Sequence, residues 1–148
     1  MDDLELLSDD HSLLSSQVIH VVALLQAIVE GRFEAAALNS EIIRQTDLLQ
    51  GQLVEHFEFE EKTAFPRLQE RFPEFSSQLE AFLAQHDQIL KAFEELQSNL
   101  NLELSQLNHV SVFSKATFFE SAFERHATSE TQLFNELAKQ IGGLAEPQ

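Results

Sequence analysis

A histidine is followed four residues later by a glutamate at two places in the chain, His56 with Glu60 and His126 with Glu130. On an α-helix, residues with this spacing lie one turn apart on the same face. An imidazole and a carboxylate placed in this way can point at one spot, which is how facing helices of a bundle assemble a metal site. Because the spacing also arises by chance in a chain rich in glutamate, a second criterion is needed.

The register of an antiparallel bundle supplies that criterion. Two residues on adjacent helices lie at the same level when the turn that joins the helices falls midway between them. Glycine, proline and asparagine indicate turns at 31–33, Phe72-Pro73 and 99–108, and these turns lie midway between candidates on successive helices. The residues that meet the criterion are His11, His56, Glu60, His86, His126 and Glu130. Because six such buried groups without a ligand would be costly to desolvate, we interpret them as holding two metal ions rather than as a hydrogen-bonded polar layer.

Four other residues of the same types fail the criterion. His20 faces the side of its helix opposite His11, at ~100° per residue. His109 precedes His126 by ~25 Å along one helix, so both are expected at the surface or at a helix end. Glu58 and Glu61 are predicted to point away from the stripe that carries His56. An exchange of either glutamate for Glu60 in the metal shell is the alternative.

The elements that must position these residues are four helices, predicted at about 9–30, 33–63, 76–100 and 110–139. Leu, Ala, Glu and Gln dominate the sequence and favour helix, while strand signals are scarce. Phe65-Pro66 is expected to break or kink the second helix, and Gly142-Gly143 to end the fourth. We therefore predict a single domain over 1–148, an all-α, antiparallel up-down-up-down four-helix bundle with a metal site in its core.

Composition excludes several classes of function. The formal net charge is −16, so the surface repels phosphate backbones and anionic membranes. The apolar run at 18–29 is too short to span a bilayer and follows acidic residues, unlike a signal peptide. The absence of cysteine rules out disulfides, thiolate ligands and Cys-bound clusters, and fits a cytoplasmic protein. The sequence contains no phosphate loop, nucleotide fingerprint or nucleophilic triad.

With the six residues placed, the sequence resembles the hemerythrin-like proteins of the HHE cation-binding type. The resemblance runs from Asp10 to about Leu137 and is most specific in HFEFEEKTAFP. It implies a non-haem di-iron centre in which one iron takes His11 and His56 and the other takes His86 and His126. Glu60 and Glu130 would bridge the irons together with an oxo or hydroxo group. Imidazole and carboxylate ligands also suit manganese or zinc.

Two departures from the oxygen-carrying members of that family bear on function. Those members have a second histidine where this chain has Leu90, and an aspartate where it has Thr131. The four-histidine, two-glutamate set is instead similar to the di-iron proteins linked to repair of iron–sulfur clusters. Those proteins usually carry a cysteine-bearing N-terminal domain, whereas this sequence has ten residues before His11 and no cysteine, so it departs from that pattern too. The resemblance thus argues against reversible O₂ transport.

Three functions compete on this basis. The first is a redox-active di-iron protein that reacts with or senses O₂, NO or peroxide, in stress response or cluster repair. The second is an iron-binding or iron-handling module without catalysis. The third is an interaction domain whose metal is purely structural.

Overall fold

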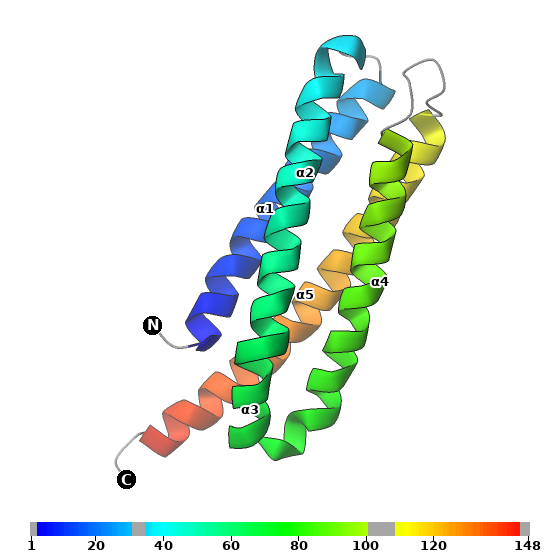
Figure 1. Ribbon diagram of the computed structural model, residues 1–148. Coiled ribbons are helices and arrows are strands. Elements are labelled where there is room, and N and C mark those ends of the chain that lie inside the picture. The colour runs from blue at the N-terminus through cyan, green and yellow to red at the C-terminus, as the bar shows by residue number, and fades with distance from the viewer. Residues whose placement is uncertain (1–2, 31–34, 101–108, 146–148) are drawn as a thin grey trace.

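In the computed structural model, residues 3–30, 35–100 and 109–145 are described. Four long helices account for most of them: α1 (Asp3–Val29), α2 (Ala35–Phe59), α4 (Ser76–Leu100) and α5 (His109–Ala145). The π-helical turn η1 (Glu60–Ala64) carries α2 directly into the short helix α3 (Phe65–Arg71), and the 3-10 turn η2 (Pro73–Phe75) leads into α4. No strand occurs among these residues. Figure 1 shows the helices arranged side by side as a bundle, with the start of α1 and the end of α5 toward the same end of it.

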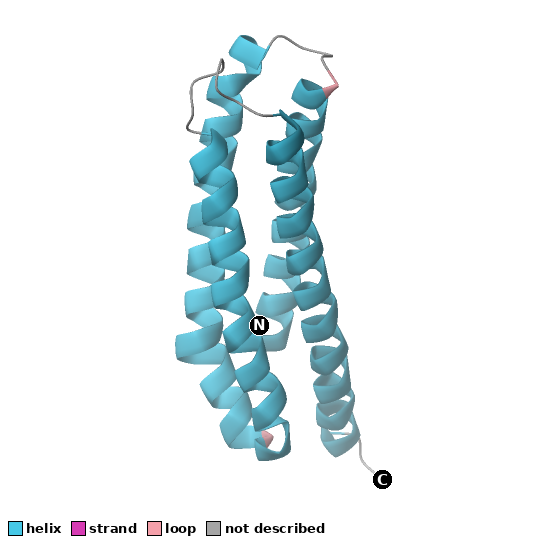
Figure 2. Ribbon diagram, turned by 90° about the vertical axis from the view of Figure 1, so that its right-hand side faces the viewer, coloured by secondary structure: helices cyan, strands magenta, loops and turns pink. Residues whose placement is uncertain are grey.

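Each long helix packs against two others, in the order α1, α2, α4, α5 and back to α1. Figure 2 shows the resulting all-helical bundle from the side. This confirms the predicted all-α bundle. Within the described residues, no helix is long and apolar enough to cross a membrane.

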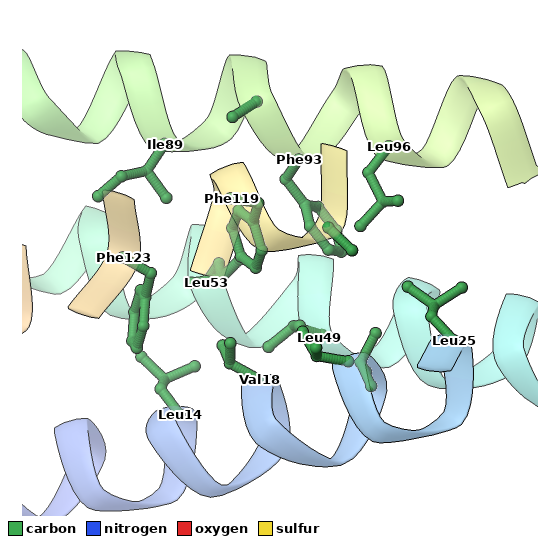
Figure 3. Packing of buried hydrophobic residues seen from close by; sticks show 14 of the residues in the cluster. Leu14, Val18, Leu25, Leu49, Leu53, Ile89, Phe93, Leu96, Phe119 and Phe123 are labelled. Carbon is green, nitrogen blue, oxygen red and sulfur yellow. The ribbon is translucent and has the colours of Figure 1, made fainter. Parts of the chain in front are cut away.

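Two apolar clusters fill the interior, one on each side of a polar layer. The larger cluster includes Leu53, Phe93, Phe119 and Phe123, which converge from α2, α4 and α5 in Figure 3. The smaller cluster gathers around α3 and includes Phe65. The aliphatic and aromatic packing of both clusters is the main force that orders the helices, because burial of apolar surface dominates folding.

The helices α1, α4 and α5 each contribute buried residues to both clusters, and α2 does so together with its continuation through η1 and α3. On α1, for example, Leu7 belongs to the smaller cluster, Leu14 to the larger one, and His11 lies between them. On α4, His86 lies between Phe82 and Ile89 in the same way. The packing of the two apolar clusters therefore fixes the position of the polar residues along the axis of the bundle.

The predicted helix bounds agree with the structure for α4 and differ elsewhere. The first helix starts at Asp3 rather than near residue 9, since Leu7 is fully buried one turn before His11. The break or kink predicted at Phe65-Pro66 falls where η1 passes into α3, and the regular α-helix gives way a little earlier, after Phe59. The predicted stop at Gly142-Gly143 is wrong, because α5 runs to Ala145; glycine weakens a helix by roughly 1 kcal/mol without forbidding it. The predicted turn at 31–33 and most of the predicted loop at 99–108 lie outside the described residues.

Candidate metal centre

Four imidazoles and two carboxylates meet in the polar layer between the two apolar clusters. They are the six residues predicted from the sequence: His11, His56, Glu60, His86, His126 and Glu130. All six are buried, and Glu60 and Glu130 have no exposed surface at all. Charged side chains are almost never buried to this degree without partners. The layer therefore requires compensating interactions.

The π-helical turn positions Glu60. From His56 onward the buried positions recur every fourth residue, at Glu60, Ala64, Leu68 and Phe72. In an α-helix, each step of four residues overshoots a full turn by ~40°, so this face would soon rotate out of the core. The wider π turn, in which the Phe65 N–H donates to the Glu60 carbonyl, takes up that rotation. Pro66 follows at once, and since it has no N–H the α-helical pattern is interrupted here in any case.

The histidines form two pairs. The rings of His11 and His56 lie edge to face with centroids 4.9 Å apart, and those of His86 and His126 repeat this arrangement at 4.9 Å. The first pair comes from α1 and α2 and the second from α4 and α5.

Each glutamate spans the two pairs with its two oxygens. Glu60 Oε1 faces the first pair, in contact with His56 Nε2 and 3.7 Å from His11 Nε2, while its Oε2 lies 3.5 Å from His86 Nε2. Glu130 Oε2 lies 3.2 Å from His11 Nε2. Its Oε1 faces the second pair, 3.8 Å from His86 Nε2 and in contact with His126 Nε2. The carboxylates are thus placed to bridge two positions.

Hydrogen bonds on the outer side orient three of the four rings. His56 Nδ1 donates to Asp10 Oδ2 at 3.3 Å, and His86 Nδ1 donates to Glu61 Oε1 at 3.1 Å. His126 Nδ1 donates to the side-chain oxygen of Gln85 at 2.6 Å. With the proton held at Nδ1, the Nε2 lone pair of each ring points inward, as a metal ligand requires.

The pKa values report the balance between burial and charge in the metal-free layer. Burial lowers the pKa of His11, but the carboxylates of Glu130 and Glu60 outweigh it and raise the pKa to about 9. The pKa of His86 is raised to about 10 in the same way, with Glu61 contributing. Burial raises the pKa of Glu60 and Glu130, yet the surrounding imidazoles more than reverse this, and both end lowered, that of Glu130 well below its ordinary value.

The donor set fits metal ions. The inward-facing atoms are buried and have no partner in hydrogen-bonding geometry among the described residues: Nε2 of His56, His86 and His126, and both oxygens of Glu60 and Glu130. One ligand atom from each of His11, His56, Glu60 and Glu130 falls within 4.8 Å of the others. The same holds for the second pair of histidines with the same two glutamates. Two overlapping sets of four donors, sharing both carboxylates, match a two-metal site.

Phenylalanine rings surround the layer. Phe57 stacks on His86 with centroids 3.9 Å apart, Phe134 stacks on His11 at 5.8 Å, and Phe82 meets His126 edge-on at 5.7 Å. These contacts exclude water and restrict rotation of the imidazoles.

The remaining candidates are not among the six residues of the layer. His20 is exposed, as predicted, and His109 begins α5, as a helix-end residue. Glu58 is exposed and lies 4.0 Å from Lys62. Neither Glu58 nor Glu61 replaces Glu60 in the layer.

The outer partners were missed by sequence reasoning. Glu61 was expected to point away, yet its carboxylate reaches the outer nitrogen of His86. Asp10 and Gln85 each stand directly before a candidate histidine of their own helix and bond a histidine of the neighbouring helix. That repeated position was a signal the sequence did contain.

A four-helix bundle with a buried histidine–glutamate layer defines the class of the molecule. The family model described as Hemerythrin HHE cation binding domain matches residues 2–138, nearly the whole chain. The protein belongs to this hemerythrin family. Neither the curated proteins nor the solved structures compared with the chain gave a match. Family and layer together indicate that the protein binds metal cations.

Proposed function

We propose that the protein is a non-haem di-iron protein that reacts with or senses O₂, NO or peroxide. The observation that carries the proposal is the placement of Glu60 and Glu130, each with one oxygen toward each histidine pair. Two bridging carboxylates offset the charge of two cations and hold them side by side.

In this proposal His11 and His56 hold one ion, and His86 and His126 hold the other. Imidazole and carboxylate ligands suit iron, and the absence of cysteine leaves no thiolate for a softer metal. Two irons would supply reversible electron transfer and open positions for a small molecule. The protein side chains orient the ligands, and the phenylalanine rings keep water from the layer. The cysteine-free composition favours action in the cytoplasm. The process that we propose for this action is stress response or cluster repair.

The visible spectrum of protein purified aerobically from iron-supplemented cells tests the redox proposal. We expect absorption bands of an oxo-bridged ferric pair, which dithionite bleaches and which NO, O₂ or peroxide then changes. Protein that carries zinc, or that is stably folded with no metal, would overturn the proposal and leave a structural bundle.

Iron handling is the second candidate function. It is favoured by a surface pocket of about 320 Å³ between α1 and α2, which reaches His56 and is lined by the carboxylates of Asp10 and Glu55. Carboxylates that line such a pocket attract cations. Two irons that a chelator removes and that do not respond to O₂, NO or peroxide would support this function over the first.

A further inference from the structure

The two halves of the layer correspond residue by residue. His11 of α1 has its counterpart in His86 of α4, and the His56–Glu60 pair has its counterpart in His126–Glu130. Figure 1 shows the two helix pairs, α1 with α2 and α4 with α5, that carry these halves. Any difference between the halves is therefore a difference between matched positions.

One outer hydrogen bond has an equivalent in each of the two halves. In each half, one helix carries a lone histidine (α1 or α4) and its partner helix carries a histidine–glutamate pair (α2 or α5). The residue just before the lone histidine accepts a hydrogen bond from the histidine of the partner helix. Asp10 does this for His56 at 3.3 Å, and Gln85 does it for His126 at 2.6 Å.

The other outer hydrogen bond is present in only one half. The residue after Glu60 is Glu61, whose carboxylate accepts from His86 Nδ1 at 3.1 Å. The residue after Glu130 is Thr131, which is exposed. The matching nitrogen, His11 Nδ1, is buried and has no hydrogen-bond partner among the described residues. The His86/His126 half therefore has both rings held from outside, and the His11/His56 half has one.

The surface pockets outside the two halves also correspond, and they differ in charge. The pocket between α1 and α2 presents Asp10 and Glu55. The matched pocket between α4 and α5, of about 250 Å³, presents Gln85 and Arg125 at the same positions. A cation approaching or leaving the first half passes two carboxylates, whereas one at the second half passes a guanidinium.

We propose that the two metal positions are unequal and that the ion between His11 and His56 is held less tightly and leaves first. Glu61 is the positioning residue responsible, because it accepts a hydrogen bond from His86 Nδ1, whereas Thr131 leaves His11 Nδ1 without an acceptor. Outer hydrogen bonds of this kind typically change metal affinity by about 10–100-fold. The inference rests on the proposed two-metal site and adds an order of release to it.

The test follows the release of Zn²⁺ from fully loaded protein into an excess of a chelating dye. We expect two phases of one ion each, with rates differing by about tenfold or more. Glu61→Thr makes the second half match the first, so it should accelerate the slow phase until the two phases merge. Glu61→Gln keeps an acceptor oxygen in place and should retain two phases. Thr131→Glu, at an exposed site, offers His11 the missing acceptor and should slow the fast phase.

The outcomes separate this inference from the function on which it rests. Two ions that leave the parent protein in a single phase would overturn the inequality while keeping the two-metal site. A Glu61→Thr variant in which only the fast phase changes would overturn the assignment of the halves. Failure of the parent protein to take up two ions would overturn the two-metal site itself. Helical circular dichroism of each variant serves as the folding control.

Discussion

Phe57 lies flat against His86, with the rings parallel to within 9° and their centroids 3.9 Å apart. Phe57 follows His56 directly on α2, so one helix turn supplies both a candidate ligand and the wall that holds a ligand of α4. Phe57 is also part of the larger apolar cluster. Packing of the core and geometry of the site are coupled at this residue.

Phe57→Ala should therefore lower both the stability of the fold and the affinity for metal, whereas a substitution elsewhere in the core should lower stability alone. Loss of the buried ring should cost about 3–5 kcal/mol of unfolding free energy, measured by urea denaturation of the metal-free protein. It should also weaken metal binding, because His86 loses the surface that holds its ring. Phe119→Ala, in the same cluster and equally buried, is the control and should lower stability alone. Equal metal affinity in the two variants would contradict the role of Phe57.

Glu60 and Glu58 provide a matched pair two residues apart. Glu60→Gln replaces a carboxylate that we propose to bridge two ions by a neutral amide with a single oxygen, so bound metal should fall from two ions to one or fewer per chain. Glu58→Gln alters an exposed side chain and should leave two. Elemental analysis after gel filtration measures both. Equal metal content in the two variants would show that Glu60 is not a ligand.

Much of this arrangement could be predicted from the sequence. Helix propensity and turn residues indicated the bundle, and the register criterion selected all six residues of the layer. The criterion works because the position of a turn fixes which residues of the two adjoining helices lie at the same level, even residues far from the turn. His20 was correctly placed at the surface by the same helical periodicity.

Other features depend on packing that periodicity does not describe. A uniform 100° per residue places Glu61 away from the layer, and it gives no sign of the π-helical turn at Glu60–Ala64. That turn exists because four helices must share a continuous core across Pro66. The extension of α5 past Gly142 was missed because the glycine pair was read as a stop, while Ile141 just before it packs against the smaller apolar cluster.

The stability of the metal-free protein should depend on pH in a defined way. The raised pKa of His11, about 9, and of His86, about 10, means that the folded state holds these protons more tightly than the unfolded state. That stabilisation is complete below pH 6.5, the ordinary histidine value, and is lost as the pH rises through 9 and 10. The lowered pKa values of Glu60 and Glu130 stabilise the fold above pH 4.5, and this contribution is lost in acid.

Thermal denaturation of the metal-free protein between acid and alkaline pH measures this dependence. The melting temperature should be highest between pH 4.5 and 6.5 and should fall on both sides. Metal-loaded protein is the control, because metal ligation requires neutral imidazoles and removes the alkaline loss. A melting temperature of the metal-free protein that rises through pH 9 would contradict the account.

Gly51 offers a test of the scaffold apart from the site. It lies inside α2, and a Cβ added there would meet no atom within 4 Å. Gly51→Ala should stabilise the protein by about 0.5–1 kcal/mol, because alanine loses less backbone entropy in a helix. Urea denaturation checks the gain, and metal content should remain unchanged. A loss of stability would indicate that the backbone at this position is not regular helix.

The central claim is that two metal ions lie side by side in the polar layer, each held by one histidine pair and both bridged by Glu60 and Glu130. Anomalous diffraction from crystals of the iron-loaded protein tests it most directly. We expect two peaks inside the bundle, one beside His11 and His56 and the other beside His86 and His126. A single peak, or iron found only at surface carboxylates, would contradict it.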